Sequence, residues 1–175
     1  PLGTVKQQRT EELPNFSVEF ISIAHSVPQT CALAIRTKYG NILHATDWRF
    51  DDEALSMLPT DFDELKKLAD EGVSMLVCDS TNIMVDKKSP SEAEVRKSLM
   101  EIIPQIEGGL IVTCFASNLM RLESLILAAD KAGRTPVLLG RTLINNIKIA
   151  KECGYLQDLP PVHTIEYHTQ HTHNH

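Results

Sequence analysis

Three polar residues that could bind a metal ion each follow a run of apolar or β-branched residues. His25 follows FSVEFISIA, Asp47 follows NILHAT and Asp79 follows VSMLVC. If these runs are parallel strands, their carboxyl ends meet at one edge of the sheet, where α/β proteins place their sites. Imidazole and carboxylate groups are ligands that zinc accepts. The pattern indicates one site, or two facing sites, although each residue alone is more often a structural histidine or a turn aspartate.

Two more polar segments follow apolar runs in the second half of the chain. FASN (residues 115–118) begins at Phe115, the last residue of the run LIVTCF. Gly140-Arg141 follows the run PVLL. A hydroxyl and an amide at a helix start, as at Ser117 and Asn118, suit phosphate binding beside free backbone N–H groups. The simpler alternative is that Ser117 or Asn118 only caps a helix.

The first half of the chain predicts a hairpin-rich sheet with one helix. A turn over residues 38–41 uses Gly40, which can take a positive φ. The run VSMLVC is almost continuously apolar, which is typical of a buried central strand. The expected strands are residues 16–24, 31–37, 41–46 and 73–78, and the expected helix is residues 60–71.

The second half predicts alternating strands and helices. Such alternation implies parallel strands with right-handed crossovers, a Rossmann-like layering. The expected strands are residues 110–115 and 136–139. The expected helices begin at Ser89 or Ser91, at Ser117 or Asn118 and at Arg141, and end near residues 103, 132 and 153. The change of pattern divides the chain into residues 1–88 and 89–175, with a disordered His-rich tail (HTIEYHTQHTHNH) at the end of the second part.

Composition limits the partners and the compartment. The chain has 175 residues, 42% of them hydrophobic, and a formal net charge of -6, which argues against a broad basic nucleic-acid surface. Bound metal ions could still supply positive charge locally.

No apolar run is long enough for a membrane helix and no secretory signal is visible. The widely spaced cysteines are typical of free thiols in a reducing cytoplasm, so we expect a cytoplasmic protein.

Six motifs occur in a fixed order: HSVP, HATDW, DSTN, SPSE, FASN with Arg121, and GRT. Together they resemble the ribonuclease J group of metallo-β-lactamase/β-CASP nucleases over residues 14–156. The resemblance implies a partial metallo-β-lactamase αββα sandwich in residues 1–88, joined to part of a Rossmann-like β-CASP domain in residues 89–175. The expected fold class is therefore α/β.

The resemblance also implies roles for individual residues. His25 would be a zinc ligand, and Asp47 would bridge two zinc ions. Asp79 would be a catalytic residue at the edge of the active site. Ser117 would lie by the substrate phosphate, and Phe115 and Asn118 would complete the substrate-binding segment.

The implied function is zinc-dependent hydrolysis of RNA, both endonucleolytic and 5′-3′ exonucleolytic, in RNA processing and decay. The complete enzyme would hold two zinc ions and form a homo-oligomer. Two departures stand out: Ala45-Thr46 replaces the family's Thr-Gly, and the upstream motif H-x-H-x-D-H is absent from the chain. We therefore expect an internal fragment that is nearly inactive alone and exposes apolar sheet faces, which favours self-association.

Two other function classes stay open. The first is a metal-free β-CASP subunit for RNA processing or assembly, favoured by the replacement at Ala45-Thr46. The second is a nucleotide-binding Rossmann-like module, suggested by the alternation of strands and helices. The sequence contains no G-x-G-x-x-G, which weakens the second alternative.

Overall fold

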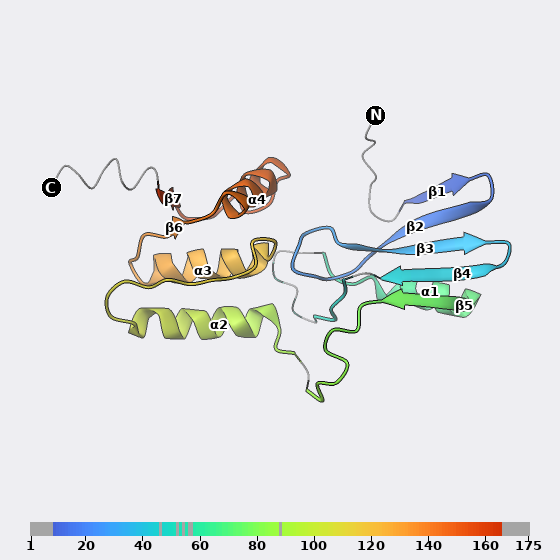
Figure 1. Cartoon of the computed structure of the whole chain (residues 1–175), viewed down its shortest axis with the longest axis horizontal. Coiled ribbons are helices and arrows are strands. Elements are labelled where there is room, and N and C mark those ends of the chain that lie inside the picture. The colour runs from blue at the N-terminus through green and yellow to red at the C-terminus, as the bar shows by residue number, and fades with distance from the viewer. Residues whose placement is uncertain are drawn as a thin grey trace. The chain divides into compact units, whose positions relative to one another are not determined.

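The computed structural model describes residues 9–45, 47–51, 53, 55, 58–87 and 89–165 (Figure 1). The chain divides into two compact units, Pro1–Ser89 and Pro90–His175. The division predicted from the sequence lies one residue earlier. Thr46 and residues 166–175 lie outside the described residues, and so does the expected disorder of most of the His-rich tail.

The first unit is built on a five-stranded sheet in the order β1-β2-β3-β4-β5. Neighbouring strands from β1 to β4 are antiparallel, whereas β5 is parallel to β4. It follows that β2, β4 and β5 run in the same direction and end at the same edge of the sheet. The strands are β1 (Thr10–Leu13), β2 (Phe16–Ser22), β3 (Cys31–Thr37), β4 (Gly40–Ala45) and β5 (Val73–Cys78).

Helix α1 (Phe62–Glu71) packs against the sheet through its apolar stripe. Leu68 is fully buried and packs with Ile21 of β2 and Ala34 of β3. Asp61 begins the helix, since its side chain accepts a hydrogen bond from the Glu64 N–H at 3.1 Å. The predicted helix is confirmed, and it begins two residues later than expected.

Strand β1 is not expected from the sequence, because TEEL lacks the alternation of a half-buried strand. It pairs with β2 in an antiparallel hairpin, with Leu13 opposite Phe16. As the outer strand it is mostly exposed, so polar residues are tolerated on it. Pairing with β2, rather than its own sequence, makes this segment a strand.

Strand β5 has the predicted bounds but not the predicted environment. The prediction of a buried central strand is wrong: β5 is the last strand of the sheet and all of its residues are exposed. Met75 and Leu76 are 56% and 60% exposed. Apolar composition could not decide this, because an exposed apolar edge and a buried strand have the same residue pattern. The resulting self-association stays a prediction.

The turn between β3 and β4 depends on glycine. Gly40 has a φ of 134°, and a Cβ placed on it would overlap the Ser74 side chain. We predict that Gly40→Ala lowers the free energy of unfolding by about 2–3 kcal/mol, because it combines a left-handed backbone with a steric overlap. Urea unfolding followed by circular dichroism measures this.

Gly109→Ala is the matched control for Gly40→Ala, since a Cβ there meets no atom within 4 Å. The control should change the unfolding free energy by less than about 0.5 kcal/mol. Equal losses in the two variants would contradict the steric explanation.

The second unit contains the three predicted helices. Ser91 begins α2 with a capping box, in which Ser91 and Glu94 exchange side-chain and backbone hydrogen bonds. The core of the second unit is formed by Leu122, Ile126, Leu138 and Ile147. The elements are α2 (Glu92–Ile102), the 3₁₀ turn η1 (Ile103–Gln105), α3 (Leu119–Lys131), β6 (Val137–Leu138), α4 (Arg141–Glu152) and β7 (His163–Thr164). No described helix is long and apolar enough to cross a membrane.

The predicted strands of the second unit are largely absent. Residues 110–115 form no strand, and Ile111 is 92% exposed. Within residues 89–165 the sheet has two short parallel strands, β6 and β7, and β7 lies where a disordered tail was expected. An apolar β-branched run becomes a strand only when it finds a pairing partner. The mixed α/β class is confirmed, but the described residues show no extended Rossmann-like sheet.

Candidate functional site

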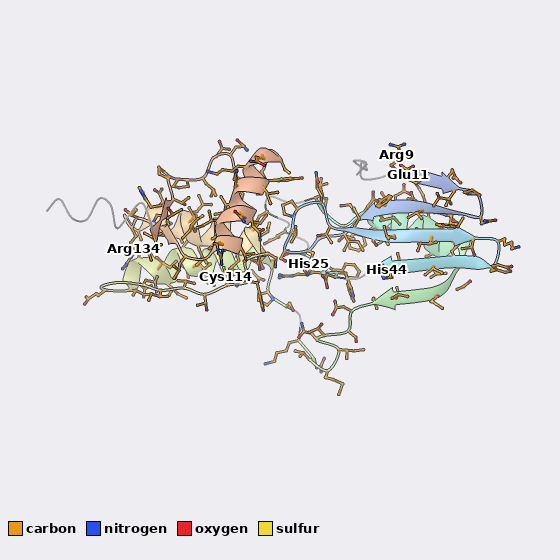
Figure 2. All side chains as sticks on the ribbon, turned by 45° about the horizontal axis from the view of Figure 1, so that its top comes forward. Arg9, Glu11, His25, His44, Cys114 and Arg134 are labelled. Atoms are coloured by element: carbon orange, nitrogen blue, oxygen red, sulfur yellow. The ribbon has the colours of Figure 1, made fainter. Side chains whose placement is uncertain are left out.

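His25, Asp47 and Asp79 lie at the edge of the first unit's sheet where β2, β4 and β5 end. Two hydrogen bonds hold the segments after these strands together. The Arg49 N–H donates to the Ala24 carbonyl at 3.0 Å, and the Trp48 Nε1–H donates to the Asp79 carbonyl at 3.1 Å. The segment after β4 is thus bonded to those after β2 and β5. Figure 2 shows His25 beyond the strands of the sheet, while His44 lies on β4 itself.

Asp79 is held as a carboxylate by its neighbours. Its side chain accepts hydrogen bonds from the Thr81 hydroxyl at 2.5 Å and from the Thr81 N–H at 2.8 Å. These bonds, the hydroxyl first, hold the pKa of Asp79 below its usual range, and the charge of His25 acts in the same direction. Asp79 is therefore ionised at neutral pH, and His25 is near enough to influence it.

We predict that Thr81→Val raises the pKa of Asp79 toward its ordinary value in metal-free protein. The main cause of the lowered pKa is the Thr81 hydroxyl, which valine lacks. A carboxyl with a lowered folded-state pKa stabilises the fold above its unfolded-state pKa, and that stabilisation disappears as pH falls through the folded-state pKa. The variant should lose this acid-range contribution. Carbon NMR titration of the Asp79 carboxyl measures the shift directly.

Thr81→Ser is the control for Thr81→Val, because it keeps the hydroxyl. Its Asp79 should titrate as in the parent chain. A pKa that stays low in Thr81→Val would show that the backbone N–H or His25 dominates instead.

His25 and Asp47 carry the donor types of a zinc site but do not complete one. His25 is half-buried, with its Nδ1 3.3 Å from the Ser26 hydroxyl oxygen, whereas Asp47 is exposed. Within the described part of the chain, no three His, Cys, Asp or Glu side chains are grouped closely enough to hold a metal ion. A structural zinc site takes four ligands and a catalytic site three. These two residues could supply part of a metal site only.

Residues 115–118 form the turn before α3 in the second unit. Asn118, rather than Ser117, is the N-cap, and its Oδ1 accepts from the Arg121 N–H at 2.9 Å. The Asn146 side chain donates to the Ala116 carbonyl at 2.8 Å, which ties the turn to α4. Phe115 is exposed. The expected position of this segment after a strand is wrong, because residues 110–115 are not a strand.

Several residues that shape these segments have no role predicted from the sequence. Trp48 and Thr81 lie inside the motifs HATDW and DSTN, so the motifs were the available signal. The Arg121 guanidinium donates to both carboxylate oxygens of Glu92, at 3.0 and 3.2 Å, and joins α2 to the start of α3. Glu92 is the last residue of the motif SPSE and Arg121 accompanies FASN, so the ordered motifs were the available signal for this pair as well.

The family model for the ribonuclease J β-CASP domain matches residues 107–174. Ribonuclease J of Sinorhizobium meliloti is 38% identical over 161 residues, which are 92% of this chain and 28% of that protein. Ribonuclease J of Mycolicibacterium smegmatis is 39% identical over 87% of this chain and 27% of its own length. This chain belongs to the ribonuclease J family. The resemblance expected from the ordered motifs is confirmed.

The ribonuclease J relatives extend the match beyond the domain that the family model covers. Ribonuclease J of Pyrococcus abyssi is 40% identical over 82% of this chain and 32% of its own length. The chain thus spans between a quarter and a third of the length of these relatives. A crystal structure of a protein of unknown function from Enterococcus faecalis matches 95% of the chain with a TM-score of 0.61 and 16% identity, which shows a shared fold.

Proposed function

We propose that the full-length protein containing this chain is a metal-dependent ribonuclease that hydrolyses RNA phosphodiester bonds, as an endonuclease and as a 5′-3′ exonuclease. The observation that carries the proposal is the common edge of His25, Asp47 and Asp79, held by the Trp48–Asp79 and Arg49–Ala24 hydrogen bonds. The names of the ribonuclease J relatives supply the substrate class. In this proposal the first unit is part of a metallo-β-lactamase sandwich and the second is part of a β-CASP domain.

His25 and Asp47 would hold metal in this enzyme, and zinc fits their nitrogen and oxygen donors. Two bound zinc ions would supply a nucleophile from water at neutral pH and neutralise charge on the phosphate. The other ligands would come from other parts of the full-length protein, since the described residues group no three donors. The isolated chain is accordingly expected to bind zinc weakly and to be inactive.

Asp79 has a more specific role than its position alone suggested. A carboxylate whose pKa is held low by the Thr81 hydroxyl is a weak proton acceptor at neutral pH. It is, however, a stable negative acceptor for the N–H or O–H group of a neighbour. We therefore propose that Asp79 orients His25 or a water molecule at this edge, and that it does not act as a general acid.

Ser117, Asn118 and Phe115 would contact the RNA. The Asn118 Oδ1 caps α3, so its side-chain NH₂ is the group that would donate to a phosphate. The Ser117 hydroxyl can donate to a phosphate as well. The exposed ring of Phe115 could contact a base. The same proposal includes a cytoplasmic location and a homo-oligomer of the full-length protein.

The test uses the full-length protein with RNA that carries a 5′ monophosphate and a 3′ label. Exonuclease action releases mononucleotides progressively, and endonuclease action gives internal fragments. A chelator should stop both activities, and added zinc should restore them. Intact RNA in the presence of zinc would overturn the proposal.

A metal-free RNA-processing or assembly subunit is the second candidate. The replacement of the family's Thr-Gly by Ala45-Thr46 favours it. Such a protein would bind RNA equally with and without chelator and would leave it uncut. The same cleavage experiment therefore separates the two candidates.

A further inference from the structure

Three aromatic rings form an exposed cluster at the edge that carries His25, Asp47 and Asp79. The ring centroids of Trp48 and Phe50 are 4.9 Å apart, and those of Phe50 and Phe62 are 5.3 Å apart. The three residues are 37%, 51% and 45% exposed, respectively. Large apolar rings gathered on a surface usually mark a place where something binds.

The Trp48 ring is fixed in place. Its Nε1–H donates to the Asp79 carbonyl at 3.1 Å, and one side of the indole contacts Phe50. Phe50 in turn contacts Phe62, the first residue of α1. Each ring is therefore held by a neighbour, and little conformational entropy remains to be lost when a flat ligand stacks on it.

A hollow adjoins the cluster at the start of α1. Its volume is about 460 Å³, and Phe62 lines it together with Ser22, Leu58, Pro59, Thr60, Asp61 and Asp63. This volume lies within the range of roughly 300–1,000 Å³ that is typical of small-molecule sites. The hollow can accommodate a planar heterocycle beside the Phe62 ring.

The charges around the cluster are mainly acidic. Asp47 precedes Trp48, Asp51 follows Phe50, and Asp61 and Asp63 flank Phe62. The guanidinium of Arg49 is offset by Asp51, 3.6 Å away. Such a surface repels phosphate but accepts the N–H groups of a flat, uncharged ring.

We propose that Trp48, Phe50 and Phe62 bind the base of an unpaired nucleotide by stacking, beside the edge that handles the phosphodiester. This inference rests on the proposed ribonuclease function and narrows its substrate to RNA with an unstacked base at this position. Stacking is worth roughly 1–3 kcal/mol per base, and every base has a face that can stack, so no strict sequence preference follows.

The experiment uses the fluorescence of Trp48, the only tryptophan in the chain. Adenosine and a five-nucleotide oligo(A) should quench it with saturation, whereas ribose 5-phosphate should not. Because stacking rather than phosphate contact holds the ligand, the affinity for oligo(A) should depend weakly on salt. A steep salt dependence, typical of several phosphate contacts, would overturn the proposal.

Phe50→Leu tests the cluster without removing the fluorophore. It should weaken oligo(A) binding about tenfold, the equivalent of about 1.4 kcal/mol for one lost stacking surface. Phe50→Tyr keeps the ring and should bind like the parent chain. Tyr39→Leu is the matched control, since Tyr39 is an exposed aromatic residue in the β3–β4 turn at the other end of β4. Circular dichroism checks that each variant is folded.

Two results would overturn the inference while leaving the proposed function intact. One is unchanged oligo(A) affinity in folded Phe50→Leu. The other is shielding of Trp48 from acrylamide in the full-length protein, which would show that another segment covers the cluster. A variant that lacks Trp48 gives the background fluorescence for this measurement. In both cases RNA cleavage by the full-length protein would continue. If the full-length protein did not cleave RNA but adenosine still quenched Trp48, only the ribonuclease proposal would be contradicted.

Discussion

Asp47→Asn should reduce RNA hydrolysis by the full-length protein more than about 100-fold, because mutation of groups that merely support a metal ligand already costs roughly 10–100-fold. Asparagine keeps the size of the side chain but removes the negative charge that could balance metal cations. Asp47 is exposed and directly precedes Trp48, whose side chain reaches Asp79. The measurement is single-turnover cleavage of end-labelled RNA together with zinc content after dialysis.

Asp70→Asn is the matched control for Asp47→Asn, because Asp70 is also an exposed aspartate of the first unit but lies on α1. It should cleave RNA at the parental rate and retain the same zinc. If Asp47→Asn retained both activity and zinc, His25 and Asp79 would have to operate without it, and the proposed site would be wrong. Loss of activity with unchanged zinc would move Asp47 from metal binding to substrate positioning.

Arg121→Met should lower the free energy of unfolding of the second unit by about 2–3 kcal/mol. Removing one member of a buried ion pair costs roughly 3–5 kcal/mol, and partial exposure of Arg121 reduces that value. The Glu92 side chain is 5% exposed and receives two hydrogen bonds from the guanidinium. Loss of Arg121 therefore removes two charge-assisted hydrogen bonds from a buried carboxylate. Urea unfolding monitored by circular dichroism gives the difference.

The double variant Glu92→Leu/Arg121→Met should recover most of the stability lost in Arg121→Met. Replacing both members of a buried ion pair by apolar residues is often neutral or stabilising. Lys148→Met is the control, because its pair with Glu152 is exposed and 3.9 Å long, and it should change stability by less than about 0.5 kcal/mol. A double variant as unstable as the single one would show that Arg121 acts through packing rather than charge.

The helices of this chain were predictable from local signals. Ser91 and Glu94 form a capping box, and Gly72 and Gly133 adopt the positive φ values that end helices. These signals act between residues a few positions apart, so they do not depend on the rest of the fold. The shared direction of β2, β4 and β5 also followed from the order of the hairpin and the crossover helix. This direction implies the common edge of His25, Asp47 and Asp79.

Strand pairing and side-chain partners were decided by the tertiary structure. TEEL became β1 because β2 offered it an edge, while the more β-prone residues 110–115 pair with no other part of the described chain and form no strand. The same composition that predicted a buried β5 is found on an exposed one. Pairing joins segments that are distant in sequence, and local residue preferences cannot specify which edge is available.

The candidate site shows the same division. By itself the sequence predicted which residues would carry the chemistry, because His25, Asp47 and Asp79 each follow a β-rich run and lie in ordered motifs. Only the tertiary structure decided what surrounds them: the Thr81 bonds that lower the Asp79 pKa, the Trp48 bond to Asp79, and the aromatic rings beside it. These contacts depend on distances and orientations between separate segments, which are set when the sheet forms.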